Sequence, residues 1–107
     1  MENECVVVWT TISRMTDGHK LASMIVSERL AACVNVLALM ESVYRWKGEV
    51  EAEQERQLIM KTTRTRVPAL KARLFELHDY EVPEFIVLPI LDGSDAYLSW
   101  IRESTAG

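Results

Sequence analysis

The stretch VNVLALMESVYRWKGEVEAEQERQLIM, residues 34–60, decides the fold of this chain. On both sides of Lys47-Gly48 its side chains alternate with a period of two, which is typical of β-strands. The Lys-Gly pair between the two runs suits a tight turn. We therefore predict one long hairpin, over residues 34–46 and 49–60, whose strands exceed the usual length of about 5–6 residues.

The alternation also predicts which side chains share a face of the hairpin. On the first strand, one face carries Val34, Val36, Ala38, Met40, Ser42, Tyr44 and Trp46. On the second strand, one face carries Glu49, Glu51, Glu53 and Glu55. This glutamate stripe is either the solvated face of an exposed hairpin, or a rim that collects cations or forms ion pairs across a subunit contact.

The segments on both sides of the hairpin complete an α+β domain. The β-branched run at residues 4–11 predicts a buried strand, and the helical spacing of apolar side chains predicts helices at 19–33, 67–78 and 95–104. Residues 83–91 predict a further strand, in which Pro89 favours either an edge position or a bulge. The order β-α-β-β-α-β plus a C-terminal helix predicts a ferredoxin-like fold. Its antiparallel sheet has the first and third strands in the centre and both crossover helices on one face.

A hairpin of this length has an edge that one small subunit does not cover. Exposed edge strands pair with other chains unless they are protected, and four aromatic side chains also need partners: Tyr44, Trp46, Tyr97 and Trp100. Assembly into a closed cyclic oligomer resolves both problems. We therefore expect the chain to associate with copies of itself.

Length and composition narrow the range of functions. The chain has 107 residues, which predicts a single domain over 1–107, and a net charge of −4, which argues against a nucleic-acid partner. Its apolar runs are shorter than the roughly 20 residues that span a bilayer, and its start lacks a basic leader, so we expect a cytoplasmic protein without a membrane partner. We find no phosphate-binding glycine loop, H-E-x-x-H motif or nucleophile elbow, and so expect no enzyme.

Two residues are candidates for metal chemistry. His78 follows the second long helix and precedes four polar neighbours that suit a Cu²⁺ or Zn²⁺ site, Asp79, Tyr80, Glu81 and Glu84. The alternative for His78 is a cap on the C-terminus of that helix. Cys33 is either a small buried hydrophobic residue or a thiolate ligand. It is not expected to form a disulfide with Cys5, because a strand would separate them.

Five blocks of sequence, in order and in register, resemble the CutA divalent-cation tolerance family. They are LAACVNV (30–36), S-x-Y-x-W-K-G-E (42–49), K-T-T (61–63), H-x-Y-E-V-P-E (78–84) and Y-L-x-W-I (97–101), and they extend over essentially the whole chain. The resemblance implies a ferredoxin-like subunit in a tight homotrimer, with hairpins and terminal helices packed across subunits. It also implies a link to tolerance of copper and other divalent ions. The family trimer resembles the PII signal proteins, which bind small effectors in clefts between subunits.

The resemblance also carries over individual residues. By motif, the cleft between subunits would be lined or supported by Tyr44, Trp46, Lys61, Tyr80, Glu84 and Trp100. Some bacterial members have a cysteine where this chain has Trp9, and two successive histidines where it has Leu77-His78. These departures argue against a high-affinity copper site of that type and make His78 the one imidazole carried over.

Three functions are consistent with this sequence. The first is a non-catalytic homotrimeric divalent-cation tolerance protein that binds copper weakly, or zinc or another divalent ion, through His78 with help from Glu84 and Cys33. The second is a PII-like sensor whose cleft binds a small anionic or zwitterionic metabolite, with Lys61 and Glu84 fixing the polarity and the cleft aromatics stacking on it. The third is a scaffold whose trimer presents a surface to another protein.

Overall fold

The computed structural model of the chain describes residues 4–107. Its elements are β1 (Cys5–Ser13), α1 (Gly18–Ser27), β2 (Cys33–Val36), β3 (Met40–Trp46), β4 (Glu49–Thr63), the 3₁₀ helix η1 (Arg64–Arg66), α2 (Val67–Leu77), β5 (Ile86–Pro89) and α3 (Asp95–Thr105). The described strands form one antiparallel sheet in the order β2-β4-β1-β5, and β3 also pairs with β4. The antiparallel α+β sheet is thus confirmed, with the first strand and the return strand of the hairpin in its centre.

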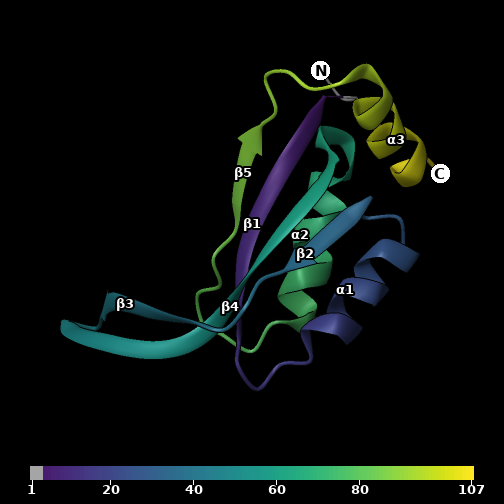
Figure 1. Ribbon diagram of the computed structural model, residues 1–107. Coiled ribbons are helices and arrows are strands. Elements are labelled where there is room, and N and C mark those ends of the chain that lie inside the picture. The colour runs from purple at the N-terminus through teal and green to yellow at the C-terminus, as the bar shows by residue number, and fades with distance from the viewer. Residues whose placement is uncertain (1–3) are drawn as a thin grey trace.

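The sheet has two unequal parts, which Figure 1 shows clearly. Most of it lies against α1 and α2, whereas β3 and the first half of β4 project away as a curved two-stranded extension. We term residues 40–55 the arm and the remaining described residues the body. The two parts share one continuous strand, β4, so the pairing that begins in the body extends into the arm.

The hydrophobic core of the body lies on one face of the sheet. Alternate residues of β1 and β4 point to the same side, because successive side chains of a strand alternate between faces. On this side α1 contributes Leu21 and Ile25, and α2 contributes Leu70 and Leu74. The strands contribute the buried side chains Val6, Val8, Ile12, Leu58 and Met60. Both helices therefore cover the same face, as predicted.

The opposite face of the body is covered only at one end in the described chain. There Ile101 of α3 packs against Cys5 and Ala32, with Leu98 beside them. Farther along, the same face carries a group of apolar side chains that we term the open apolar face: Val7, Trp9, Ile59, Ile86 and Leu88. Trp9 is 36% exposed, Ile86 47% and Leu88 44%. Exposed apolar side chains gathered in this way are typical of surfaces that contact another molecule.

The first helix is shorter than predicted. Residues 19–33 were expected to be helical, but α1 ends at Ser27, and Cys33 begins a strand. Arg29 adopts a left-handed φ of 60°, and the amides of Arg29 and Leu30 donate to the carbonyls of Val26 and Ile25. This pattern is the Schellman motif, which places an apolar residue back against the last turn. Leu30 is therefore buried at helical spacing without being helical.

The two later helices agree with the sequence. The second, α2, ends at Leu77 with His78 as its C-cap, and α3 begins after Ser94, whose side chain accepts a hydrogen bond from the Tyr97 amide. The predicted strand at 83–91 is present but short. Among the described strands, β5 pairs only with β1, which confirms the edge alternative for Pro89. None of the helices in residues 4–107 is long and apolar enough to cross a membrane.

The predicted single strand at 34–46 is two strands. Val36 pairs with Leu58 and Met40 pairs with Glu55, so four steps along the first chain segment match three steps along β4. One extra residue is accommodated between them, as in a β-bulge. Val34 and Val36 therefore face the helices with Met60 and Leu58. The predicted common face is wrong, because four later residues lie on the opposite side: Met40, Ser42, Tyr44 and Trp46.

The turn of the hairpin lies where the sequence places it. Trp46 pairs with Glu49, which leaves Lys47 and Gly48 as a two-residue loop. Both have positive φ, 50° for Lys47 and 83° for Gly48, as the type I′ turn requires. This turn fixes the register of the arm and hence which side chains face one another across it.

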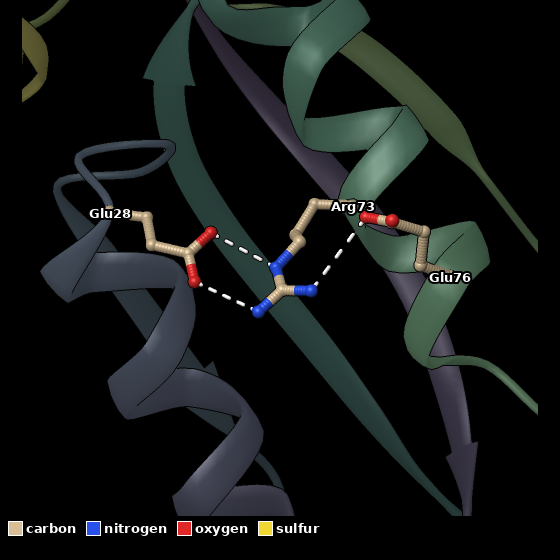
Figure 2. A network of polar contacts seen from close by, with 3 residues as sticks. All are labelled: Glu28, Arg73 and Glu76. Carbon is tan, nitrogen blue, oxygen red and sulfur yellow. Dashed lines mark hydrogen bonds and ion pairs between the residues drawn. The ribbon is translucent and has the colours of Figure 1, made fainter.

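A charged network links the C-terminal end of α1 with the C-terminal half of α2 (Figure 2). Arg73 of α2 donates two hydrogen bonds of 3.0 Å to the carboxylate of Glu28, the C-cap residue of α1. Its third guanidinium nitrogen lies 3.7 Å from Glu76. The hydrogen bond to Glu28 is the main cause that raises the pKa of Arg73. The paired fork geometry links α1 and α2 beside the apolar core, which holds the two helices together.

Candidate functional site

A pocket of about 810 Å³ lies between the arm and the loop that follows α2. Three cross-strand pairs, Tyr44 with Glu51, Ser42 with Glu53 and Met40 with Glu55, share a face and form its arm wall. The full lining is Thr11, Met40, Ser42, Tyr44, Trp46, Glu51, Glu53, Glu55, Gln57 and residues 79–84. The pocket therefore lies on the same side of the sheet as the open apolar face.

The pocket is strongly acidic. Its lining includes six carboxylates and, among the described residues, no lysine or arginine: Glu51, Glu53, Glu55, Asp79, Glu81 and Glu84. Glu81 has an ion pair at the rim, 3.8 Å from the ammonium group of Lys47 at the arm turn. Closely spaced carboxylates create a negative potential that attracts cations and repels anions.

Glu55 and Tyr80 connect the arm with the loop. Glu55 is only 9% exposed, and the Tyr80 hydroxyl donates to its Oε1 at 3.1 Å. Within residues 4–107 no ion pair reaches this carboxylate. Burial raises the pKa of Tyr80 far above its usual value, and the hydrogen bond to Glu55 adds to that shift. Tyr80 therefore stays protonated and remains a donor.

Glu84 is fixed to the sheet at the base of the pocket. Gln57 Nε2 donates to Glu84 Oε2 and to the Thr10 carbonyl, each at 2.8 Å. Thr10 in turn donates through its hydroxyl to the Glu84 carbonyl at 2.6 Å. These bonds leave the second carboxylate oxygen of Glu84 without a partner among the described residues. The end of the loop is thus held in place while its carboxylate lines the pocket.

Both ring nitrogens of His78 have partners. Nδ1 accepts a hydrogen bond from the Tyr80 amide at 3.2 Å, and Nε2 lies 2.6 Å from the Thr11 carbonyl, to which it donates in the matching tautomer. The rings of His78 and Tyr80 also contact each other, with centroids 4.7 Å apart. His78 is the C-cap residue of α2. Its ring is hydrogen-bonded to the backbone of β1, so it connects the end of α2 to the sheet and does not cap the carbonyls of the helix.

The structure brings together four of the six predicted cleft residues within one chain. Tyr44, Trp46, Tyr80 and Glu84 line the pocket, whereas Lys61 and Trp100 do not. Lys61 hydrogen-bonds to Asn35 on the open side of the sheet, and Trp100 contacts Tyr97 on α3 with ring centroids 5.3 Å apart.

The three predicted metal ligands do not converge either. Cys33 pairs with Lys61 at the far end of the sheet from the His78 contact. Among residues 4–107 no group of three or more His, Cys, Asp or Glu side chains could hold a metal ion. Cys5 and Cys33 are both free.

The sequence analysis left the glutamate stripe either as a solvated face or as a rim that collects cations or forms ion pairs, and it did not place this stripe on the same face as the aromatic side chains. The signal that could have found it is the Lys47-Gly48 turn. A two-residue turn forces Trp46 to pair with Glu49, and the alternation then forces Tyr44 to pair with Glu51. The aromatic stripe and the glutamate stripe must therefore share a face.

Comparison with known proteins gives consistent matches. The family model for "CutA1 divalent ion tolerance protein" matches residues 6–104. The chain is 46% identical over 99 residues to the divalent-cation tolerance protein CutA of Thermus thermophilus, covering 92% of this chain and 96% of that protein. It is also 46% identical over 100 residues to the chloroplastic CutA of Arabidopsis thaliana, covering 94% of this chain but only 55% of that longer protein.

Solved structures agree with the sequence matches. The Thermus thermophilus divalent cation tolerance protein superposes with a TM-score of 0.91 at 45% identity, covering 95% of this chain and 99% of that one. CutA1 from a psychrotrophic Shewanella superposes with a TM-score of 0.92 at 32% identity over the full length of both chains. Likeness in fold and in sequence therefore extends over the same residues.

Proposed function

The chain belongs to the CutA1 divalent ion tolerance family, and from this premise we propose that it binds copper, zinc or another divalent ion as a non-catalytic homotrimer. The observation that carries the proposal is the acidic pocket, whose described lining includes six carboxylates and no lysine or arginine, with Lys47 pairing to Glu81 at the rim. Carboxylate oxygens and imidazole nitrogens together suit divalent ions of this class.

Glu84 and His78 are the proposed ligands. Glu84 offers a carboxylate oxygen at the base of the pocket, and His78 lies beside Tyr80 in the adjoining loop. To bind a metal, the imidazole must give up one of its two hydrogen bonds, so binding is expected to be weak.

Cys33 is left out of the proposed ligand set. Cys33 pairs with Lys61 of β4, which in turn pairs with Val7 of β1. Val7 lies four residues along β1 from Thr11, whose carbonyl is hydrogen-bonded to His78. Four strand residues span about 13 Å, far beyond the bond lengths of one coordination sphere.

The proposed trimer consists of ferredoxin-like subunits that meet through the open apolar face. Trp9, Ile86 and Leu88 there are exposed in the single chain, and burying such a surface is the main driving force for association. The arm extends beyond the body and can reach a neighbouring subunit. Each subunit thus has an apolar surface and a projecting strand pair to contribute to the assembly.

A PII-like sensor for an anionic metabolite is the less favoured function. The six pocket carboxylates repel an anion, and Lys61, which was expected to fix the polarity of such a ligand, is not part of the pocket lining.

Native mass spectrometry of the purified protein tests the proposal. We expect a trimer that takes up about one Cu²⁺ or Zn²⁺ per subunit, with uptake lost in His78→Ala and Glu84→Gln. His19→Ala is the matched control, because His19 is an exposed histidine near the start of α1. A monomer would contradict the proposed assembly. A metal-free trimer, or uptake that is unchanged in both His78→Ala and Glu84→Gln, would contradict the proposed metal site.

A further inference from the structure

The C-terminal helix α3 packs on the sheet separately from the other two helices. Its buried residue Ile101 packs against Cys5 and Ala32, a small apolar cluster apart from the main core under α1 and α2. The connection from β5 to α3 crosses the end of the sheet as an irregular loop (Figure 1), in which Leu91 is 93% exposed. Segments with a small apolar contact and an exposed connection open at a lower free energy than the core of a protein. Both features are present in α3.

Two arginines of the body hold the carbonyl end of this helix. Arg66 of η1 donates from Nε to the Thr105 carbonyl at 2.6 Å. Arg29 donates from Nη1 to the Ala106 carbonyl at 3.5 Å. A Cβ atom on Gly107 would lie 3.3 Å from Arg29 Cδ and 3.9 Å from Arg66 Nη2, so this residue lies against both side chains. The last carbonyls of a helix lack partners within it and carry partial negative charge, which cationic side chains offset.

The backbone of Arg29 is a separate sign that its side chain has a role. Arg29 has a φ of 60°, the left-handed conformation that closes α1 and that glycine adopts at a lower cost. A residue held in a costly conformation is a reason to look for what its side chain does. The guanidinium contact with Ala106 supplies that role, because glycine at this position could not reach α3.

We infer that α3 is a strap that releases from the body as one unit while the rest of the chain stays folded, and that Arg29 and Arg66 form the latch that keeps it closed. Release would uncover Cys5, which is 3% exposed and donates from Sγ to the Leu98 carbonyl of α3 at 3.6 Å. The uncovered surface continues the open apolar face, so the latch would control how far that face extends. These contacts lie within one chain, and the inference depends on neither the proposed metal site nor the proposed trimer.

Thiol labelling of Cys5 in the full, natively assembled chain measures strap release, because at low reagent concentration the labelling rate follows the open population. The sequence has two cysteines, so Cys33→Ser leaves Cys5 as the single reporter. In this background Arg66→Met should label about tenfold faster, because α3 loses a hydrogen bond from a charged group. Arg64→Met is the matched control, since Arg64 belongs to the same 3₁₀ helix but pairs with Glu4. It should label within about twofold of the background.

Arg29→Gly separates the latch from overall stability, because its two expected effects have opposite signs. Glycine relieves the left-handed backbone, so the urea midpoint of global unfolding should rise. Loss of the guanidinium contact should nevertheless speed the labelling of Cys5 by about twofold to fivefold. A change in overall stability alone would slow the labelling as the midpoint rises. This variant also keeps the inference open to test if Arg66→Met does not fold.

Three results would overturn the inference. One is labelling of Cys5 that is no faster in Arg66→Met and Arg29→Gly than in Arg64→Met. The second is labelling that rises with urea as steeply as global unfolding does, which would show that α3 does not release separately. The third is labelling that becomes faster on dilution, which would show that release follows subunit dissociation. A rate that is independent of protein concentration, with the expected ranking of the variants, supports the strap.

Discussion

Leu58 and Met60 in the body and Val43 and Val50 in the arm belong to the same pair of alternating sequence runs, yet their surroundings differ completely. The first two are fully buried under α1 and α2, whereas Val43 is 66% and Val50 67% exposed. The body is held together by side-chain packing, and the arm mainly by its backbone hydrogen bonds and its turn. The alternating pattern specifies a strand in both places, but it does not specify what covers that strand.

A two-stranded ribbon alone is marginally stable in water. The arm therefore depends on β4, which continues into the body, and on two contacts with the loop after α2. One is the Tyr80–Glu55 hydrogen bond, and the other is the exposed Lys47–Glu81 ion pair. In the proposed trimer a neighbouring subunit provides further support.

Truncating one apolar side chain in each region gives the largest expected difference. Ile25→Ala should lower the free energy of unfolding by about 2–5 kcal/mol, because Ile25 is completely buried in the body core. Val50→Ala should change it by less than about 0.5 kcal/mol. Urea unfolding at one fixed protein concentration checks both values. A large loss for Val50→Ala would show that the assembly buries the arm.

Removing the hydroxyl that joins the arm to the loop is the next largest change. Tyr80→Phe should destabilise the protein by about 1–3 kcal/mol, because the buried Glu55 carboxylate then loses its donor. Hydrogen exchange should increase in the arm more than in the body. Tyr97→Phe is the control, since Tyr97 is 43% exposed on α3. Equal effects of the two variants would contradict the assigned role of Tyr80.

The same tyrosine predicts a loss of stability at high pH. The pKa of Tyr80 is raised in the folded protein, first by burial and then by Glu55. Its ordinary value is about 10, so above that pH the unfolded chain releases a proton that the folded chain keeps. Stability should be unaffected by Tyr80 below that pH and should fall as pH rises above it. Melting temperatures between neutral and alkaline pH test this, and Tyr80→Phe should make the decline less steep.

Strain in the arm turn has a smaller predicted effect. Gly48→Ala should cost about 1 kcal/mol, because φ of 83° is unfavourable for a residue with a Cβ atom. No atom lies within 4 Å of the position that the Cβ would occupy, so the cost is due to the backbone alone. Chemical denaturation measures this cost. Replacing Lys47 by Asn, a residue that tolerates positive φ, should have the opposite sign. A destabilised Lys47→Asn variant would argue against this account of the turn.

The ion pair that joins the body helices should give the smallest effect. Glu28 and Arg73 are partly exposed, with side chains 41% and 29% accessible, so water screens their attraction. We expect a coupling energy of about 0.2–1 kcal/mol in a double-mutant cycle with Glu28→Gln and Arg73→Met. The coupling should decrease as salt is added. A coupling several times larger would mean that this network, rather than the apolar core, fixes the two helices.

The sequence predicts most elements of the fold because local patterns and local structure agree. The hairpin turn, α2, α3 and the edge position of Pro89 all appear as predicted. The end of α1 was missed because the left-handed position that closes it holds Arg29 instead of glycine, and Leu30 continues the apolar spacing. A Schellman motif and a helix that continues for one more turn both bury Leu30 at the same spacing, so the apolar pattern does not distinguish them.

The candidate site was harder to predict than the fold. Tyr44, Trp46, Tyr80 and Glu84 were named from family motifs, and the pocket includes all four. The buried state of Glu55 could not be predicted, because it depends on a loop that is distant in sequence and carries Tyr80. His78 has carboxylate neighbours in the sequence, but in space it is hydrogen-bonded to the backbone.

The extra residue between Val36 and Met40 affects the direction of the arm without changing which residues pair with one another. Three residues, 37–39, lie opposite two on β4, so removing any one of them would leave Val36 with Leu58 and Met40 with Glu55. Such a deletion would keep every paired residue and yet straighten the bend that a bulge imposes. The identity of these three residues can therefore vary more freely than their number. The number of residues in this segment determines the direction of the arm, while the pairing within the arm stays the same.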